Sequence, residues 1–282
     1  QHASKNTVSP APLQNPFNSY QAAAAPSWEI DLWGRIRRLT EAAQASLLAT
    51  EEARRGVILS LVSGVASSYI QLRGLDEQLE ITKRTLKAYA ESVRLFELQF
   101  KHGVISRMTV EQARSQYETA AATIPQLEMQ IAEVENALSL LLGRNPGPIE
   151  RGKSILELAM PDVPSGVPSQ VLERRPDILQ AEQQLVAANA QIGAARALYF
   201  PTITLTGGYG QASADLSNLF KGPARVWSYG GSVTGPLFAG GAIHGQVLQA
   251  ESGQKEALLS YQAAVQSAFG DVENSLVANQ MY

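Results

Sequence analysis

The sequence predicts a mainly α-helical protein in which long antiparallel coiled-coil helices are joined to membrane-type β-strands. The stretch AARALYFPTITLTGGYG at 194–210 changes from a helix-favouring run to a strand at Pro201, which has no N–H to continue a helix. After Pro201, apolar and hydroxyl side chains alternate, as in a strand between lipid and a water-filled lumen. Apolar heptad repeats elsewhere predict paired helices.

Composition excludes several classes of function. The 282 residues carry a net charge of −3, so no basic excess favours nucleic acid. The chain has no cysteine, which removes disulfides, Cys-type zinc sites and Cys nucleophiles. His2, His102 and His244 do not have metal-ligand spacing, and no complete nucleophile elbow or dinucleotide loop is present. We therefore expect no enzyme activity, no cofactor and no metal site.

An alternating strand is predicted over 18–32. Its apolar face carries Trp28 and Ile30, which we expect to contact lipid, and its other face carries Glu29 and Asp31. The two carboxylates form either a charge pair in a wet lumen or a solvated pair near the junction with the following helix.

A long helical hairpin is predicted over 33–143, with its tip at 102–109. Gly103 suits the left-handed conformation at a helix end, and Ser106 is a candidate N-cap. The first arm has a heptad seam at Leu79, Thr82, Leu86, Tyr89, Val93, Phe96 and Phe100. The seam of the second arm is Val110, Ala113, Tyr117, Ala120, Ile124, Leu127, Ile131, Val134, Leu138 and Leu141.

The second half of the chain repeats the change between helix and strand. A Pro- and Gly-rich connector at 144–168 leads to a helix at 169–199, a β-hairpin at 200–238 with a polar loop at 211–225, and a final helix at 239–282. The apolar, lipid-facing side of the β-hairpin comprises Ile203, Leu205, Tyr209, Trp227, Tyr229, Val233 and Leu237.

Two other features have structural explanations. The stretch 56–72 has no charge, but it contains serines and is shorter than the about 20 apolar residues of a membrane span, so we expect a helix buried among other helices. Arg174 and Arg175 are expected at an exposed helix start or as ion-pair partners.

Several segments together resemble the TolC-like outer membrane factors, and among these the OprM-like (NodT) branch. They are WEIDLWGRIR at 28–37, HGVISRMTVEQAR at 102–114, ALSLLLGRNPG at 137–147, LERRPDILQAEQQLVAANAQIGAARALYFPTITLTGG at 172–208, and PLFAGG at 236–241. The matches are spread over most of the chain.

The resemblance implies a homotrimer in the Gram-negative outer membrane that extends into the periplasm. Its strands form a shared 12-stranded transmembrane β-barrel in contact with outer-membrane lipid, and its long helices form a periplasmic α-barrel. On this view 1–17 is the remnant of an extracellular loop and 144–168 is an equatorial connector. The first barrel strand, the second helical hairpin and a lipid-bearing Cys are expected outside this stretch of sequence.

The function implied is the outer-membrane channel of a tripartite efflux system. This passive duct exports small molecules such as drugs or toxic compounds from an inner-membrane pump and a periplasmic adaptor. The adaptor-docking tip comprises Gly103, Val104, Ser106, Met108 and Thr109. Thr109 stands where the family motif has Asp, which leaves the identity of the adaptor open. Two alternatives are a type I secretion duct and a non-membrane periplasmic coiled-coil adaptor.

Overall fold

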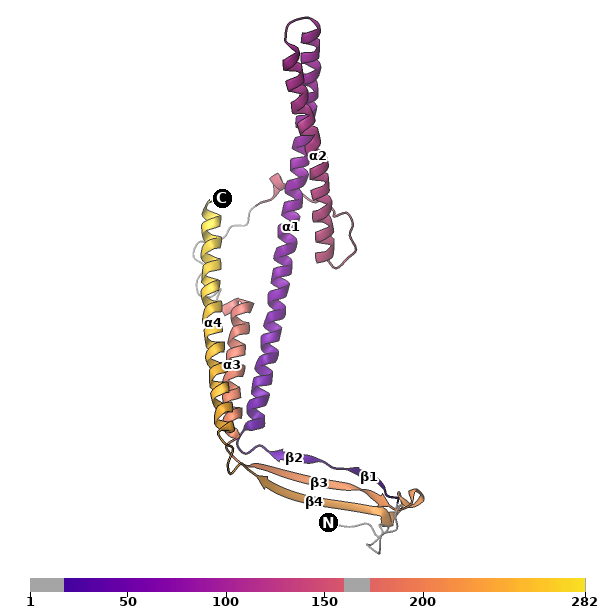
Figure 1. The fold of residues 1–282 in the computed structure, drawn as a ribbon, viewed down its shortest axis with the longest axis vertical. Coiled ribbons are helices and arrows are strands. Elements are labelled where there is room, and N and C mark those ends of the chain that lie inside the picture. The colour runs from indigo at the N-terminus through magenta and orange to yellow at the C-terminus, as the bar shows by residue number, and fades with distance from the viewer. Residues whose placement is uncertain (1–17, 160–172, 282) are drawn as a thin grey trace. The chain divides into compact units, whose positions relative to one another are not determined.

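The computed structural model describes residues 18–159 and 173–281. The chain divides into two compact units. Unit 1 falls within Gln1–Ala53 and Pro168–Tyr282, and unit 2 within Arg54–Val167. Unit 1 contains a β-sheet and the helices that leave one end of it, and unit 2 contains a helical hairpin (Figure 1).

The sheet of unit 1 is antiparallel and is built around one long strand. Its strands are β1 (Tyr20–Ala24), β2 (Ser27–Ile30), β3 (Thr202–Ser213) and β4 (Arg225–Thr234). Both β1 and β2 pair with β3, and β4 pairs with β3 on its other edge. The single strand predicted over 18–32 is therefore divided at Pro26, because proline has no N–H to donate to the ladder. The carbonyl of Pro26 still accepts from the N–H of Gly207 at 2.9 Å.

The predicted boundaries of the β-hairpin are wrong at both ends. The two strands extend into the predicted loop, since β3 continues to Ser213 and β4 begins at Arg225. At the other end β4 stops at Thr234, so Leu237 does not belong to a strand. Pro236 provides the physical reason, because it cannot donate a ladder hydrogen bond.

Helices α3 (Pro176–Ala197) and α4 (Ala242–Met281) lie side by side in unit 1 (Figure 1). The buried face of α3 is made mostly of small residues, which let helix backbones approach closely: Ala181, Ala187, Ala190, Ala194 and Ala197. Gly193 of α3 makes a close contact with a different helix. A Cβ atom at this position would lie only 3.0 Å from Cγ of Arg38 in the first turn of α1 (Arg35–Lys101).

Ion pairs fix the two ends of the α3–α4 contact. Arg175 at the start of α3 binds Asp177 at 2.7 Å and Asp271 of α4 at 2.9 Å. Its hydrogen bond to Asp177 raises the pKa of Arg175 and lowers the pKa of the Asp177 carboxyl. Near the other end, Arg196 binds Glu251 at 2.8 Å. The interpretation of Arg175 as an ion-pair partner is confirmed.

The predicted hairpin is formed by α1 and α2 (Arg107–Leu141), which lie side by side in Figure 1. Unit 2 contains α2 and the part of α1 that begins at Arg54. The heptad positions of α2 from Val110 to Leu138 are buried or half-buried, whereas the last predicted position, Leu141, is exposed and Ser139, outside the seam, is buried. The α1 seam is half-buried from Leu79 to Phe96 and becomes exposed at Phe100. The stripes are therefore the packing core of the hairpin.

A cluster of charges holds the connector that follows α2 against the hairpin. Arg151 binds Asp76 of α1 at 2.9 Å and also pairs with Glu135 of α2. The hydroxyl of Tyr69 accepts from the N–H of Gly152 at 2.8 Å. Contacts within unit 2 thus join residues that lie far apart in the sequence.

Several expectations fall outside the described residues. These are the loop remnant at 1–17, the connector residues 160–168 and the first residues, 169–172, of the predicted helix at 169–199. Among the described helices, none has a stretch long and apolar enough to cross a membrane.

Candidate functional site

The β-sheet has one face of large apolar side chains. The register pairs Ile203 with Val233 and Ile30, and it pairs Leu205 with Trp28. Residues paired across adjacent strands point to the same face. The predicted lipid-facing residues within the strands therefore share one face: Trp28, Ile30, Ile203, Leu205, Tyr209, Trp227, Tyr229 and Val233. Leu237 is the exception, because it lies beyond the end of β4.

The opposite face of the sheet is small and hydroxylic. Thr204 pairs with Ser232 and with Glu29, and Thr202 pairs with Thr234. Large apolar residues on the first face are strongly exposed, with Tyr229 at 77% and Trp28 at 66%. This alternation is the pattern found in strands of membrane barrels, which have lipid on one face and a polar lumen on the other.

Stacked aromatic pairs lie at the junction with the helices and on the apolar face. At the helical end, Trp33 stacks on Phe200 with ring centroids 4.5 Å apart, and its indole N–H donates to the carbonyl of Pro201 at 2.8 Å. Toward the other end, Trp227 stacks on Tyr229 at 5.8 Å. Aromatic rings with a polar edge favour the interface between an apolar layer and water.

The two carboxylates near residue 30 lie at the junction of strand and helix. Glu29 accepts two hydrogen bonds from the guanidinium of Arg35, at 3.1 and 2.7 Å. Asp31 accepts from the N–H groups of Ile36 and Arg37, at 2.9 and 2.8 Å, and so caps the start of α1. Partial desolvation raises the pKa of Asp31, but these hydrogen bonds outweigh it and hold the pKa below its usual value. The carboxylates therefore stabilise the junction.

The hairpin tip has the geometry that its sequence predicts. Gly103 has φ +74°, in the left-handed region that glycine adopts without strain. Ser106 is the N-cap of α2, and its hydroxyl accepts from the N–H of Thr109 at 3.4 Å. Val104 and Met108 are 71% and 69% exposed. The tip is thus an ordered turn that presents two large apolar side chains to solvent.

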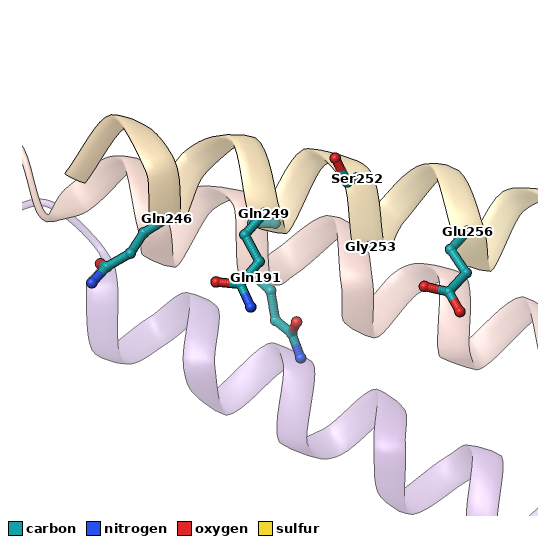
Figure 2. A pocket seen from close by; sticks show the side chains of 7 residues that line it. Gln191, Gln246, Gln249, Ser252, Gly253 and Glu256 are labelled. Carbon is teal, nitrogen blue, oxygen red and sulfur yellow. The ribbon is translucent and has the colours of Figure 1, made fainter. Parts of the chain in front are cut away.

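A polar groove of about 530 Å³ on α3 and α4 was not predicted. Figure 2 shows Gln191, Gln246 and Gln249 pointing to the same side, with Ser252 pointing away from them. Among the described residues that line the groove, Glu256 alone is acidic. The helical spacing of Gln246 and Gln249 on α4 could have indicated the groove, but a stripe of polar residues is typical of any solvent-exposed helix face.

The described residues hold no cluster of His, Cys, Asp or Glu that could bind a metal ion. The carboxylates at the junction of strand and helix, Glu29 and Asp31, are paired in ways that stabilise the fold, and His102 is exposed at the tip. The candidate functional surfaces are therefore the two-faced sheet, the hairpin tip and the polar groove.

The model of the outer membrane efflux protein family matches residues 2–144 and 167–281. The chain belongs to this family. It is 40% identical over 258 residues to the probable outer membrane lipoprotein SilC of Salmonella typhimurium, covering 91% of this chain and 56% of SilC. It is 38% identical over 266 residues to the solvent efflux pump outer membrane protein SrpC of Pseudomonas putida, covering 94% of this chain and 57% of SrpC.

A solved structure of CusC has a TM-score of 0.86 to this chain at 35% sequence identity, covering 97% of this chain and 64% of that one. The fold is thus that of a known channel protein. The chain spans little more than half the length of the relatives SilC and SrpC.

Proposed function

We propose that the protein is the outer-membrane channel component of a tripartite efflux system. In this role it is a passive duct that carries small molecules from an inner-membrane pump and a periplasmic adaptor to the cell exterior. The names of its relatives SilC and SrpC, an outer membrane lipoprotein and an outer membrane efflux protein, support this assignment. Drugs, solvents and other toxic compounds are the proposed cargo.

The observation that carries the proposal is the two-faced sheet. Its apolar face requires lipid or another apolar partner, since exposed apolar surface of this extent is rare on soluble monomers. Its hydroxylic face suits a water-filled lumen. A non-membrane adaptor has no need for a strand face made of Trp, Tyr, Leu, Ile and Val, so the sheet favours the channel over the coiled-coil adaptor.

The open edges of the sheet support assembly into a homotrimer. Within the described residues, β4 pairs with β3 alone, which leaves its other edge without a partner. An unpaired strand edge in hydrocarbon leaves several backbone groups without hydrogen bonds, and barrels avoid this by closing. Strands from other parts of the full-length protein and from neighbouring copies would complete the barrel.

The hairpin tip is the proposed adaptor-docking site. Val104 and Met108 are exposed at the turn and offer an apolar contact, while Gly103, Ser106 and Thr109 hold the turn in shape. The polar groove of Gln191, Gln246 and Gln249 suits the wall of an unselective tunnel, because neutral amides interact weakly with many solutes. Energy for transport would come from the pump.

An efflux assay tests the proposal. The full-length protein carrying Val104→Glu and Met108→Glu is expressed with its cognate pump and adaptor in cells that lack another channel. We expect drug accumulation to rise to the level of the channel-free strain, with an unchanged amount of protein in the outer membrane. Gln130→Glu, an exposed change on the shaft of α2, serves as the control. Normal efflux by the tip variant would refute docking through the tip, and no efflux by the wild-type protein would refute the proposed function.

A further inference from the structure

An arginine lies at the end of the apolar sheet face that is remote from the helices. Arg225 begins β4 and pairs with Gln211 of β3. Because Trp227 and Tyr229 follow at steps of two, Arg225 points to the same face as these rings. Its side chain is exposed, and among the described residues its guanidinium has no ion-pair partner. A cation thus stands on the face proposed to contact lipid.

The length of β3 gives the depth of this cation. Gln211 lies nine residues beyond Thr202, the first residue of β3 at the helical end. At about 3.4 Å per residue this is about 30 Å along the strand, or about 23 Å across a membrane for a tilt of about 40°. The apolar band of a membrane barrel is about 25 Å tall. Arg225 therefore falls at the far edge of the band, on the extracellular side, where lipid headgroups begin.

The neighbours of Arg225 favour a ligand with both acceptors and donors. Lys221, four residues earlier, supplies a second cation in the same hairpin end, and its ammonium donates to the side chain of Asn218 at 2.6 Å. Gln211 has a buried side-chain oxygen that no described group satisfies. A guanidinium matches a phosphate, and an amide oxygen matches a hydroxyl or amide donor. A phosphorylated sugar carries both kinds of group.

We propose that Arg225, with Lys221 and Gln211, binds the phosphorylated sugar headgroup of an outer-leaflet glycolipid. The acyl chains of this lipid would lie along the apolar face beside Trp227 and Tyr229. The guanidinium would donate to phosphate oxygens, and the side chain of Gln211 would turn to accept from the sugar. This inference rests on the proposed function, because it requires the apolar face to contact the outer membrane.

Lipid binding by the purified full-length protein tests the inference. Detergent-solubilised protein is titrated with a bisphosphorylated diglucosamine lipid, with the same lipid after removal of its phosphates, and with phosphatidylglycerol, and bound lipid is counted by native mass spectrometry. We expect the phosphorylated glycolipid to bind best and Arg225→Gln to weaken it about tenfold. Arg225→Lys should restore part of the binding. Arg84→Gln, which removes an equal charge from the hairpin of unit 2, should have no effect.

Two results would overturn the inference. One is equal binding of the phosphorylated glycolipid by Arg225→Gln and the wild-type protein. The other is equal binding of the phosphate-free lipid or of phosphatidylglycerol to the wild-type protein. Either result, from protein that still inserts into vesicles, leaves the proposed function intact. Failure of the wild-type protein to insert would instead count against the channel itself, and with it against this inference.

Discussion

Substituting one residue on each face of the sheet tests which face contacts lipid. Leu205 lies on the apolar face and Thr204, its neighbour in β3, lies on the hydroxylic face. Leu205 is three residues beyond Thr202, which is about 10 Å along the strand and about 8 Å into the apolar band. An arginine on a lipid face costs about 2–4 kcal/mol at the midplane and about 0–1 near the interface. At the depth of Leu205 we expect a cost of about 2 kcal/mol per subunit.

The matched variants are Leu205→Arg and Thr204→Arg in the full-length protein. A cost of about 2 kcal/mol corresponds to about a thirtyfold change in the folding equilibrium of each subunit. Thr204→Arg should cost much less, because its side chain would enter water next to Glu29, with which Thr204 pairs. The stability of both variants is measured by unfolding in guanidinium, with the folded fraction monitored by the heat-modifiable mobility of the barrel on gels. Equal loss of stability in the two variants, or a larger loss for Thr204→Arg, would refute the assigned faces.

Three further predictions concern the helices. Desolvation raises the pKa of Glu135, but hydrogen bonds from Arg151 and the backbone outweigh it and hold the pKa below its usual value of 4.5 in the folded protein. The ionised carboxylate therefore contributes to stability above about pH 4.5, and this contribution is lost as the pH falls through the lower folded pKa. Arg151→Met should weaken the dependence of the melting temperature on acid pH and should cost about 1 kcal/mol of stability at pH 7. A melting temperature that falls with pH as steeply as in the wild-type protein would contradict the role given to Arg151. Gly103→Val should cost about 1–2 kcal/mol because of its φ of +74°, and Gly103→Asn less, as measured by thermal melts; equal melting temperatures for the two would contradict this. Gly193→Val should destabilise by about 1–3 kcal/mol, because Arg38 occupies the space beside it, whereas Gly64→Ala, with nothing within 4 Å, should stabilise α1 by up to about 1 kcal/mol. An unchanged melting temperature for Gly193→Val would show that Arg38 can move aside without cost, contrary to this prediction.

Periodic patterns account for what the sequence predicts well. The seam from Val110 to Leu138 repeats often enough to define the buried face of α2. The alternation after Pro201 defines the faces of β3 because the side-chain period of a strand is two. Gly103 and Ser106 predict the tip because each satisfies a specific backbone requirement.

Contacts between distant residues leave no such pattern. Arg151 and Asp76 are far apart in the sequence, and nothing local to either one indicates that they pair. The same holds for Arg175 and Asp271. The error at Leu237 has a different origin, because its spacing from Val233 fits the strand period while Pro236 ends the ladder before it. The groove of Gln side chains was missed because polar helix faces are common.

The central claim is that the two faces of β3 meet lipid and water. The 282 residues contain no cysteine, so single cysteines can be placed at Ile203, Thr204, Leu205 and Thr206 of the full-length protein in vesicles once any reactive cysteine outside this stretch has been replaced by serine. Each cysteine carries an environment-sensitive fluorophore, which is quenched either by a lipid-borne quencher or by a water-soluble one. We predict that positions 203 and 205 are quenched from lipid and that positions 204 and 206 are quenched from water. Quenching without a period of two, or with the two faces reversed, would contradict the account.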